Sequence, residues 1–534
     1  MQHYRAVLAM GAVILPFSAC KSSSDQWNLQ LFPHVAENQL PFESADTFRI
    51  VLERNNDEEE VYEFDAAETV QLEGADALDN TPIRVDILEG DTVIATGRTA
   101  PLTQDDGNQE VGILVANTES VAFLSELENG IQASTLTSLG NGRFLSTGGL
   151  NMLGMLRDGE ARDEIRWLEL GTVDPEQAPS FTDIGTMPPY VTEAGESRTG
   201  RHAHTATVLS APAELEGHVL VAGGTNTLME TPGVTASAFI VDPSTGEATK
   251  IDEEDDLRDP RMGHLAVANS NGDVIFFGGW TYDEDPLVLA PAQTMEVFVP
   301  TERRFRRGKL RDVRLAGRYG YGFAASIPTV GIVHCGGVVS TQDGGWRSVN
   351  DCVLIDLGLT VEAIEPLPLP LAHASMIALP NRQLLVTGGL EVSTSQPDDE
   401  AVLANKKAYL YDHDTNTWTE AGQMKRGRNR HQSALLPDGR VLIIGGRSAG
   451  LGFDEHNSAD FEDCLEIYDP ATDPIDPFVL LDGCSQSTGN GQALSEAASN
   501  PAVVNDPDFG VLMVGGLGNN GSSKAVNLWV SAAP

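Results

Sequence analysis

The stretch Arg440-Val441-Leu442-Ile443-Ile444-Gly445-Gly446 decides the fold, because it is a short apolar run closed by a glycine pair and it recurs along the chain. The further copies share that form: Gly142–Gly149, Val219–Gly224, Val274–Gly279, Gly331–Gly337, Leu384–Gly389 and Val511–Gly516. A fixed-format repeat of this kind is the sequence signature of a propeller or a solenoid. The chain is therefore expected to be a repeat protein built from strands.

Composition agrees with a turn-rich globular protein and restricts its partners. The 534 residues include 53 Gly and 29 Pro, and short β-type runs outnumber long helical patterns. The 34 Lys and Arg against 78 Asp and Glu give a net charge of -44. Nucleic acid is a poor partner, because binding it requires cations that neutralise phosphates. The acidity fits either solubility through mutual repulsion or a salt-rich habitat, in which salt screens that repulsion.

Residues 1–20 have the form of an export signal. Arg5 precedes an apolar run, Ala6–Phe17, which is followed by Ser18-Ala19-Cys20. A cation, a short apolar core and small residues before a cleavage point mark a secretory signal peptide. The run is too short to span a bilayer as a permanent helix.

The ending Leu15–Cys20 resembles the lipobox of bacterial lipoproteins, with Phe17 where Leu is usual. The resemblance implies that residues 1–19 are a lipoprotein signal peptide, that Cys20 is lipidated and that residues 20–26 are a tether. Because Lys21 and not Asp follows the cysteine, it also implies an exported protein anchored to the membrane, in the outer membrane of the envelope. A plain signal peptide with a chance cysteine is the alternative.

A small β-sandwich domain of immunoglobulin-like size is expected over residues 27–118. Glycine pairs are absent from this region, and short alternating runs such as Phe48–Leu52 and Ile83–Ile87 are separated by polar turns. Several short strands at regular spacing favour a sandwich. Its expected role is a spacer between the membrane and the repeats.

Each glycine pair belongs to a larger unit of four strands. In the copy that begins at Arg428-Asn429-Arg430-His431, the strands are expected before Pro437, over Arg440–Gly446, over Cys464–Asp469 and near Pro477–Leu481. This unit resembles the kelch repeat, and the resemblance covers about residues 119–534. It implies an all-β, seven-bladed kelch β-propeller, a fold similar to the central domain of galactose oxidase.

The last repeat lacks its fourth strand, because the chain ends soon after Ala525–Val530. An unassigned strand-like run, Val121–Leu124, precedes the first full repeat. Residues 119–126 are therefore expected to close the last blade as its outer strand, which is the usual closure of kelch propellers.

The long loops predict which face of the propeller binds. In a four-stranded meander, the connections between strands 2 and 3 and between strands 4 and 1 emerge on one face. Here the connections after the glycine pairs are long and irregular: 150–163, 225–236, 280–292, 338–350, 390–405 and 447–462. Long loops on a rigid frame are where binding usually resides.

Two sets of arginines are candidate ligand-binding residues. The first is a dense cluster: Arg303, Arg304, Arg306 and Arg307. The second stands where the repeats begin: Arg201, Arg261, Arg318 and Arg428. Such cations suit an anionic polysaccharide or an acidic protein loop. The alternative for the cluster is internal charge balance with acidic runs such as Glu253–Asp256.

Cysteine and histidine positions favour structural roles. Two disulfides within blades are expected, Cys335–Cys352 and Cys464–Cys484, because each pair adjoins across neighbouring strands and export permits oxidation. There is no CxxC pattern to favour zinc, and no metal site is expected. Histidines recur once per repeat, which favours blade packing over ligation: His204, His264, His373 and His431. His334 is expected to be a satisfied buried side chain.

These features favour a lipid-anchored binding or scaffold protein of the cell envelope, which uses the long-loop face to hold an envelope protein or a polysaccharide. No cofactor and no catalytic residue is expected, since no serine elbow, phosphate loop or paired-carboxylate signature is present. The alternative is an exported carbohydrate-active enzyme on the same fold, either galactose oxidase-like or a sugar epimerase. The alternative rests on fold analogy, which is weak evidence for function.

Overall fold

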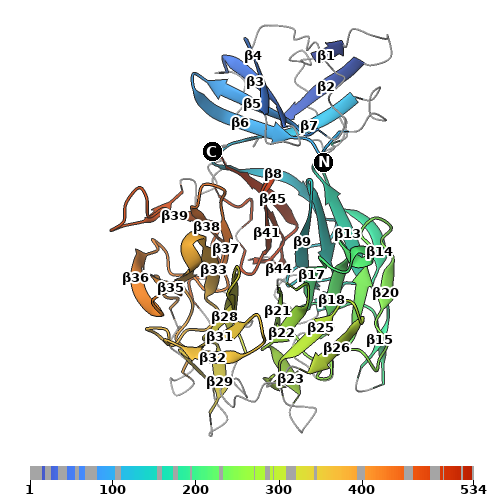
Figure 1. Cartoon of the computed structure of the whole chain (residues 1–534), viewed down its shortest axis with the longest axis vertical. Coiled ribbons are helices and arrows are strands. Elements are labelled where there is room, and N and C mark those ends of the chain that lie inside the picture. The colour runs from blue at the N-terminus through green and yellow to red at the C-terminus, as the bar shows by residue number, and fades with distance from the viewer. Residues whose placement is uncertain are drawn as a thin grey trace.

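The regular secondary structure of the described part of the chain is almost entirely strand, and the strands form a propeller beside a smaller sheet (Figure 1). The computed structural model describes these residues: 15–18, 26–33, 45–53, 59–65, 81–102, 110–152, 159–171, 173, 179–192, 195–227, 233–269, 271–282, 289–292, 294–307, 320–341, 346–393, 403–449, 461–481, 493–496, 498–518 and 521–531. The helical elements among them are single 3₁₀ turns, η3 (Ala213–Leu215) and η4 (Pro380–Arg382). In this described part, no helix has the length and apolar character needed to cross a membrane.

Seven four-stranded antiparallel sheets form the blades, and the predicted all-β, seven-bladed kelch-type propeller is confirmed in the described residues. Blade 1 contains β9 (Thr135–Gly140), β10 (Arg143–Thr147), β13 (Glu164–Glu169) and β14 (Thr182–Thr186). Blade 2 contains β17 (Thr205–Val208), β18 (Val219–Ala222), β19 (Ala238–Val241) and β20 (Ala248–Lys250). Blade 3 contains β21 (Leu265–Ala268), β22 (Val274–Phe277), β25 (Glu296–Val299) and β26 (Arg304–Arg307).

The remaining blades repeat the same order. Blade 4 contains β27 (Phe323–Ile327), β28 (Gly331–Cys335), β31 (Cys352–Asp356) and β32 (Val361–Ile364). Blade 5 contains β33 (Ser375–Leu379), β34 (Gln383–Thr387), β35 (Lys407–Asp412) and β36 (Thr417–Gln423). Blade 6 contains β37 (Gln432–Leu435), β38 (Val441–Ile444), β39 (Leu465–Tyr468) and β40 (Phe478–Leu480). Blade 7 contains β41 (Ala502–Asp506), β42 (Gly510–Val514), β45 (Ala525–Val530) and β8 (Ser120–Glu126).

Blade 7 is assembled from both halves of the sequence. The strand β8 pairs antiparallel with β45, and Val121 lies opposite Trp529, which is fully buried. Next to this pairing, the guanidinium of Arg440 contacts both carboxylate oxygens of Glu119, at 2.7 and 3.0 Å. The ring is thus closed by an outer strand that comes from before the first blade.

The second strand of each blade is apolar because neighbouring blades cover both of its faces. All four residues of β38 are buried, as are all four of β18 and of β22. Burying one such side chain contributes about 1.5–3 kcal/mol. The glycine that closes β38 is required sterically, since Gly446 has φ 106° and a Cβ there would lie 2.9 Å from the Asn429 carbonyl oxygen.

The N-terminal strands form one seven-stranded sheet in the order β1-β2-β7-β6-β5-β3-β4. Their bounds are β1 (Leu15–Ser18), β2 (Gln26–Pro33), β3 (Thr47–Glu53), β4 (Glu59–Asp65), β5 (Ile83–Glu89), β6 (Thr92–Arg98) and β7 (Glu110–Asn117). The strand β2 runs parallel to β7, and this pairing joins β1 and β2 to the rest. An immunoglobulin-like sandwich of two sheets is therefore not confirmed, because continuous pairing connects the described strands. The strand β1 lies within the segment predicted to be a signal peptide.

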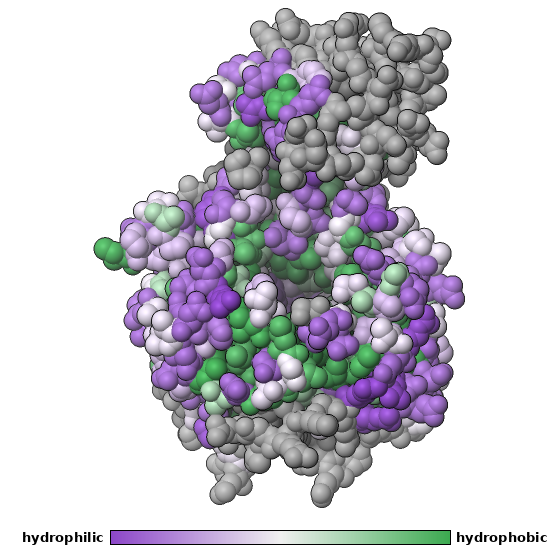
Figure 2. All heavy atoms as spheres, in the orientation of Figure 1, coloured by the Kyte–Doolittle hydropathy of each residue, from purple (hydrophilic) through white to green (hydrophobic). Residues whose placement is uncertain are grey.

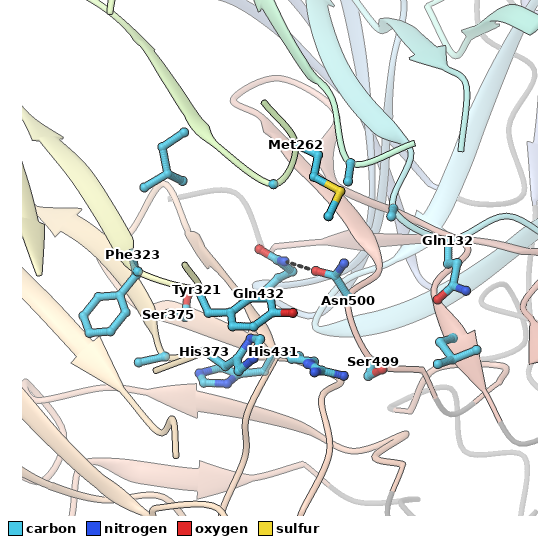
Figure 3. Close-up of a pocket in the computed structure, with 18 of the residues that line it drawn as sticks. Gln132, Met262, Tyr321, Phe323, His373, Ser375, His431, Gln432, Ser499 and Asn500 are labelled. Carbon is cyan, nitrogen blue, oxygen red and sulfur yellow. Dashed lines mark hydrogen bonds between the residues drawn. The ribbon is translucent and has the colours of Figure 1, made fainter. Parts of the chain in front are cut away.

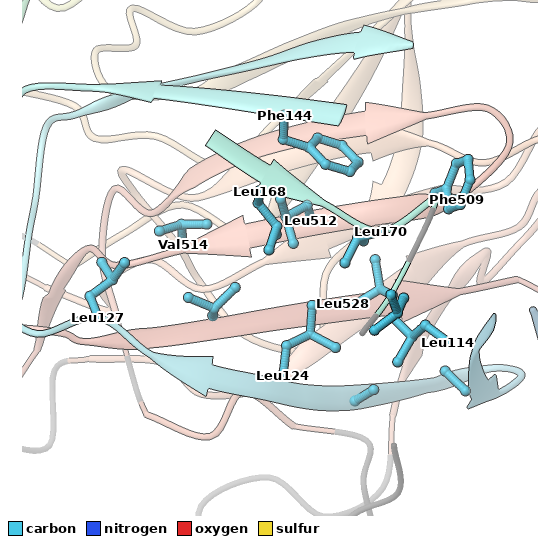
Figure 4. Close-up of a cluster of buried hydrophobic side chains, with 14 of the residues drawn as sticks. Leu114, Leu124, Leu127, Phe144, Leu168, Leu170, Phe509, Leu512, Val514 and Leu528 are labelled. Atoms are coloured by element: carbon cyan, nitrogen blue, oxygen red, sulfur yellow. The ribbon is translucent and has the colours of Figure 1, made fainter. Parts of the chain in front are cut away.

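The N-terminal sheet packs against blades 1 and 7. Leu114 and Ala116 of β7 belong to a buried cluster that includes Phe144 of blade 1 and Leu512 of blade 7 (Figure 4). The backbone N–H of Ala100 donates to the carbonyl of Gly171 at 2.7 Å, and Arg98 forms an ion pair with Asp508 of blade 7. The sheet and the propeller thus share apolar and ionic contacts.

Among the described residues, short hairpins follow the glycine pairs in four of the blades. They are β11 (Leu150–Met152) with β12 (Gly159–Ala161), β23 (Trp280–Tyr282) with β24 (Leu289–Pro291), β29 (Val338–Ser340) with β30 (Trp346–Ser348), and β43 (Leu517–Gly518) with β44 (Gly521–Ser522). A further hairpin, β15 (Tyr190–Val191) with β16 (Ser197–Arg198), connects blades 1 and 2. Figure 2 shows hydrophobic residues around a hollow near the middle of the propeller.

Candidate functional site

A cavity of about 400 Å³ is lined by residues from all seven blades. These residues precede the first strand of a blade, as Asn500 does, lie at its start, as Gln432 does, or follow its glycine pair, as Trp280 and Leu517 do. The cavity therefore lies on the face where the sequence places its long loops. Polar and aromatic side chains share its walls with aliphatic ones (Figure 3).

One residue per blade, placed just before the first strand, has a left-handed backbone conformation. Their φ angles lie between 50° and 61°. In blade order they are Ala133, Ala203, Gly263, Tyr321, His373, Arg430 and Asn500. We call these seven residues the inner ring. Non-glycine residues rarely have φ in this region, and such residues cluster at functional sites.

Backbone hydrogen bonds link the residues of the inner ring within blades 1–3 and within blades 4–7. The N–H of Ala203 donates to the Ala133 carbonyl at 3.0 Å, and the N–H of Gly263 donates to the Ala203 carbonyl at 2.7 Å. A second series runs from the His373 N–H to the Tyr321 carbonyl, from Arg430 to His373 and from Asn500 to Arg430, at 2.8–3.0 Å. Because these bonds involve only main-chain atoms, the side chain at each position can vary without losing them.

The inner ring has a side of small residues and a side of larger residues, which we call the filled side. Blades 1–3 contribute small residues, Ala133, Ala203 and Gly263, whereas blades 4–7 contribute Tyr321, His373, Arg430 and Asn500. The filled side reaches into the cavity from neighbouring blades (Figure 3). Over blades 1–3 the wall is formed by neighbours of the inner ring, among them Gln132, His202 and Met262.

An aromatic series supports the filled side. The Tyr321 ring stacks on His373 with 4.0 Å between centroids, and Trp280 contacts Tyr321 at 5.2 Å and Trp346 at 4.9 Å. Gly320 permits this packing, since a Cβ there would lie 2.2 Å from the Trp280 ring. The hairpin β29–β30 thus positions Trp346, which in turn supports the cavity wall at Trp280.

Side chains that can form hydrogen bonds make up the polar wall. The side-chain amide of Gln432 donates to Oδ1 of Asn500 at 3.4 Å, which leaves Nδ2 of the Asn500 side chain as a donor (Figure 3). Burial raises the pKa of Tyr321, so its hydroxyl stays protonated. Burial also lowers the pKa of His373 well below its ordinary value, with a further contribution from Arg430. His373 is therefore a neutral stacking partner near neutral pH.

The charge of the cavity is positive although the whole chain is acidic. Burial lowers the pKa of Arg430 to about 10, so this guanidinium is still charged near neutral pH. Among the described residues that line the cavity, none is Asp or Glu. Arg447 lies close enough to lower the pKa of Arg430 further, so two guanidiniums contribute to the local potential.

Three of the predicted binding arginines are buried inside the blades. Arg201, Arg261 and Arg428 have no exposed surface. Arg201 donates to the carbonyls of Gly223 and Ser237, at 3.1 and 2.9 Å. The structure corrects their expected role: within the described residues they hold strands together and do not line the cavity.

Arg261 and Arg428 form the same contact in blades 3 and 6. Arg261 pairs with Glu296 at 2.9 Å, and Arg428 pairs with Glu466 at 2.8 Å, with both partners fully buried in each pair. Each carboxylate also accepts two backbone N–H bonds. Arg318 lies outside the described residues.

The predicted arginine cluster lies on the outermost strand of blade 3, away from the cavity. Arg303, Arg304 and Arg306 are exposed, and the latter two form ion pairs with Glu302. The backbone N–H of Phe305 donates to the Asp255 carbonyl at 2.8 Å, so the acidic run 253–256 lies beside this strand. The side chain of Arg307 is outside the described residues.

The recurring histidines make a repeated contact between blades. His204, His264 and His431 each bond through Nε2 to a threonine hydroxyl of the preceding blade, at 2.8, 2.9 and 2.8 Å. His373 is the exception, because it lies one residue earlier and belongs to the inner ring. His334 is buried and packs edge-on against Phe277 at 5.4 Å.

The predicted disulfide Cys335–Cys352 is confirmed, and its cysteines lie directly opposite each other on β28 and β31. The second predicted pair is not tested, because Cys484 lies outside the described residues; Cys464 is buried in blade 6. Cys20 also lies outside them.

One group of described residues has metal-ligand chemistry. Ligand atoms of Glu462, Asp463 and Cys464 lie within 4.8 Å of one another. Glu462 is already engaged by Arg426 at 3.4 Å. This group is not part of the cavity.

The inner ring was missed by sequence reasoning. The residues of the inner ring differ chemically from blade to blade, so no residue type recurs at this position of the repeat. The available signal was positional: in Arg-x-x-His, the third residue immediately precedes the repeated histidine, as in Arg428-Asn429-Arg430-His431. Only the backbone conformation shows that this position faces the cavity.

Comparison with known proteins supports the repeat assignment. No protein-family model matches the chain. The chain is 33% identical over 157 residues to kelch repeat and BTB domain-containing protein 12 of zebrafish (Danio rerio), covering 28% of this chain and 22% of that protein. It is 29% identical over 165 residues to the human (Homo sapiens) protein of the same name, covering 30% and 24%. The chain thus spans under a quarter of the length of these relatives.

Among solved structures, YjhT is similar at a TM-score of 0.44 and 15% identity, over 67% of this chain and 99% of that one. That likeness is too weak to support a functional conclusion.

Proposed function

We propose that this kelch-repeat propeller is a binding module that holds a protein partner on the face of the central cavity. The observation that carries the proposal is the inner ring: each of the seven blades places one residue at one cavity, on a backbone that is hydrogen-bonded between blades within blades 1–3 and within blades 4–7. A rigid frame with variable side chains at one mouth suits recognition, because little conformational entropy is lost on binding.

The kelch-repeat relatives favour a protein-interaction scaffold, and the cavity agrees in its chemistry. Interface centres are enriched in aromatic residues and arginine, and Trp280, Tyr321 and Arg430 line the cavity. The long loops of the same face would add contacts around it.

The location of the protein belongs to the proposal and rests on the sequence. The leader and the lipobox-like ending at Cys20 favour export and lipid anchoring in the outer membrane. A polysaccharide of the envelope is the second candidate ligand.

The test is a pull-down from envelope extract with a bait that begins at Lys21. Three baits are compared: the unaltered protein, a cavity variant (Tyr321→Phe with Asn500→Asp) and a rim variant in which Arg303, Arg304, Arg306 and Arg307 become Ser. A partner that is retained by the rim variant and lost by the cavity variant supports binding at the inner ring. Retention by the cavity variant with loss by the rim variant would move the site to the arginine cluster and contradict the proposal.

The alternative function, a carbohydrate-active enzyme, is tested by a separate activity assay. Substrate-dependent peroxide formation by a copper-containing preparation would favour a galactose oxidase-like activity. None of the described cavity residues is assigned a catalytic role.

A further inference from the structure

We infer that the outer edge of blade 3 is a second binding site, which takes a phosphate or sulfate group of a larger ligand through Arg258, Arg304 and Arg306. This site is separate from the one in the proposed function, because none of the three arginines lines the central cavity. The inference rests on an open cavity, on the frame that holds the arginines and on a charge that nearby acids balance only in part.

The site is an open cavity of about 510 Å³ at β26, the outermost strand of blade 3 (Figure 1). We call it the outer cavity. Its described lining consists of Arg258, Arg304, Phe305 and Arg306, and contains no acidic residue. Three cations thus surround one space in a chain whose net charge is -44.

Buried groups hold the backbone that carries these arginines. The ring of Phe305 packs against Phe276 and Phe298, with 5.1 and 5.0 Å between centroids, and so fixes β26 against the core of the blade. The backbone N–H of Arg258 donates to the buried carboxylate of Glu296 at 2.7 Å. A rigid frame reduces the conformational entropy that is lost when a ligand binds.

The acids near the outer cavity balance only part of its charge. One carboxylate, that of Glu302, pairs with both Arg304, at 2.8 Å, and Arg306. Asp273 is also near, since Arg306 opposes the effect of burial, which raises the pKa of the Asp273 carboxyl. Arg258 is exposed, and no ion pair joins it to another described residue. Arg304 and Arg306 therefore share one carboxylate, and Arg258 remains for an external anion.

The chemistry of the donors favours a tetrahedral oxyanion. A guanidinium has five N–H donors in a planar fork, which matches the oxygens of a phosphate or a sulfate. Arg304 uses Nε and Arg306 uses one Nη atom for Glu302, so each has further donors. Three arginines suit a group with three free oxygens better than a carboxylate, which has two.

The experiment compares four sugars that differ at carbon 6: glucose 6-phosphate, glucose 6-sulfate, glucuronate and glucose. Binding to the full chain is measured by saturation-transfer NMR titration at low ionic strength, where charges are least screened. We expect the phosphate or the sulfate to bind about tenfold more tightly than glucuronate, and glucose to bind least. The tighter of the two esters identifies the ligand as phosphorylated or sulfated. Binding of glucuronate as tight as that of both esters would overturn the inference.

Two variants assign the binding to the outer cavity. Arg258→Gln should weaken binding of the preferred ester about tenfold, because a charge-assisted contact is lost. Glu302→Gln should tighten it, because the carboxylate that competes for Arg304 and Arg306 is removed. Unchanged binding in Arg258→Gln, or unchanged or weaker binding in Glu302→Gln, would contradict the inference.

Arg382→Gln is the matched control. Arg382 is another exposed arginine, and it pairs with Asp414 of blade 5 at 3.1 Å. This variant changes the net charge as much as Arg258→Gln does, and it should leave ester binding unchanged. Equal weakening in both variants would mean that only the overall charge matters, which would overturn the assignment to the outer cavity.

The rim variant separates this inference from the proposed function. It should lose the ester and still retain the protein partner. If it binds the ester as tightly as the unaltered protein, the inference fails and the proposed function stands.

Discussion

At the scale of single residues, the same side-chain type has opposite roles in neighbouring positions. Arg428 is fully buried and bonds to Glu466, whereas Arg430, two residues later, lines the cavity. The difference arises from the left-handed turn at Arg430, which directs the chain toward the preceding blade. Residue type alone therefore does not identify the binding groups.

The buried pair between Arg428 and Glu466 gives a stability prediction. Glu466→Gln removes the charge that balances a guanidinium with no exposed surface, so we expect a loss of about 3–5 kcal/mol in the free energy of unfolding. Urea denaturation measures it. The control is Glu302→Gln, which affects only exposed arginines and should cost less than about 1 kcal/mol. Similar losses in both variants would contradict the prediction.

Asp256 gives a pH prediction. Burial raises the pKa of this carboxyl to about 7, above its unfolded value of about 3.9. The folded state then holds a proton that the unfolded state has lost, so this group's contribution to stability falls as pH rises from about 4 to about 7.

Asp256→Asn should remove that penalty, because an amide oxygen can still accept the 2.8 Å bond from the Ala238 N–H. We expect the variant to match the original protein near pH 4 and to be more stable near pH 8, by thermal unfolding at both pH values. A variant that is less stable at pH 8 would show that the charged carboxylate is needed.

At the scale of elements, β8 decides whether blade 7 is complete. This strand covers β45, and Ala122 and Leu124 belong to the buried cluster between blades 7 and 1. Without β8, β45 would become an exposed edge with unpaired backbone groups, which favours aggregation.

Two N-terminal truncations separate the role of β8 from that of the preceding sheet. Removing residues 1–117 deletes the N-terminal sheet with its contacts through Leu114 and Ala116, and we expect a destabilised but folded propeller. Removing residues 1–126 also deletes β8 and should cause aggregation or loss of cooperative unfolding. Size-exclusion chromatography and calorimetry compare the two. Equal behaviour of both would show that β8 is dispensable.

At the scale of the whole molecule, the net charge of -44 opposes compactness. The described ion pairs bring some acids next to cations, as Glu302 lies beside Arg304, but 78 acids face 34 cations. Stability should therefore depend on ionic strength more than in a protein with balanced charge.

Raising NaCl from about 0.01 M to about 0.5 M shortens the screening length from about 30 Å to a few ångströms. We expect the Tm to rise over this range, with most of the increase at the low-salt end. Sucrose at equal osmolality is the control for general exclusion effects. A Tm that falls with NaCl would mean that the ion pairs contribute more than the repulsion costs.

The sequence by itself determined the repeat architecture, the blade count and the Cys335–Cys352 disulfide. These depend on local pattern: an apolar run buried on both faces, a glycine pair that a Cβ would obstruct, and strand positions that oppose each other. Such features follow from the local spacing of residues, so they can be recognised in the sequence alone.

Only the tertiary structure decided which residues meet at the cavity. The inner ring draws one residue from each blade, and its members share a backbone conformation and not a side-chain type. Likewise, Arg201, Arg261 and Arg428 share a residue type that suggested binding, yet burial assigns them to the blade interior. The residues that line the cavity are brought together by the ring closure of distant segments, and no local sequence pattern shows that proximity.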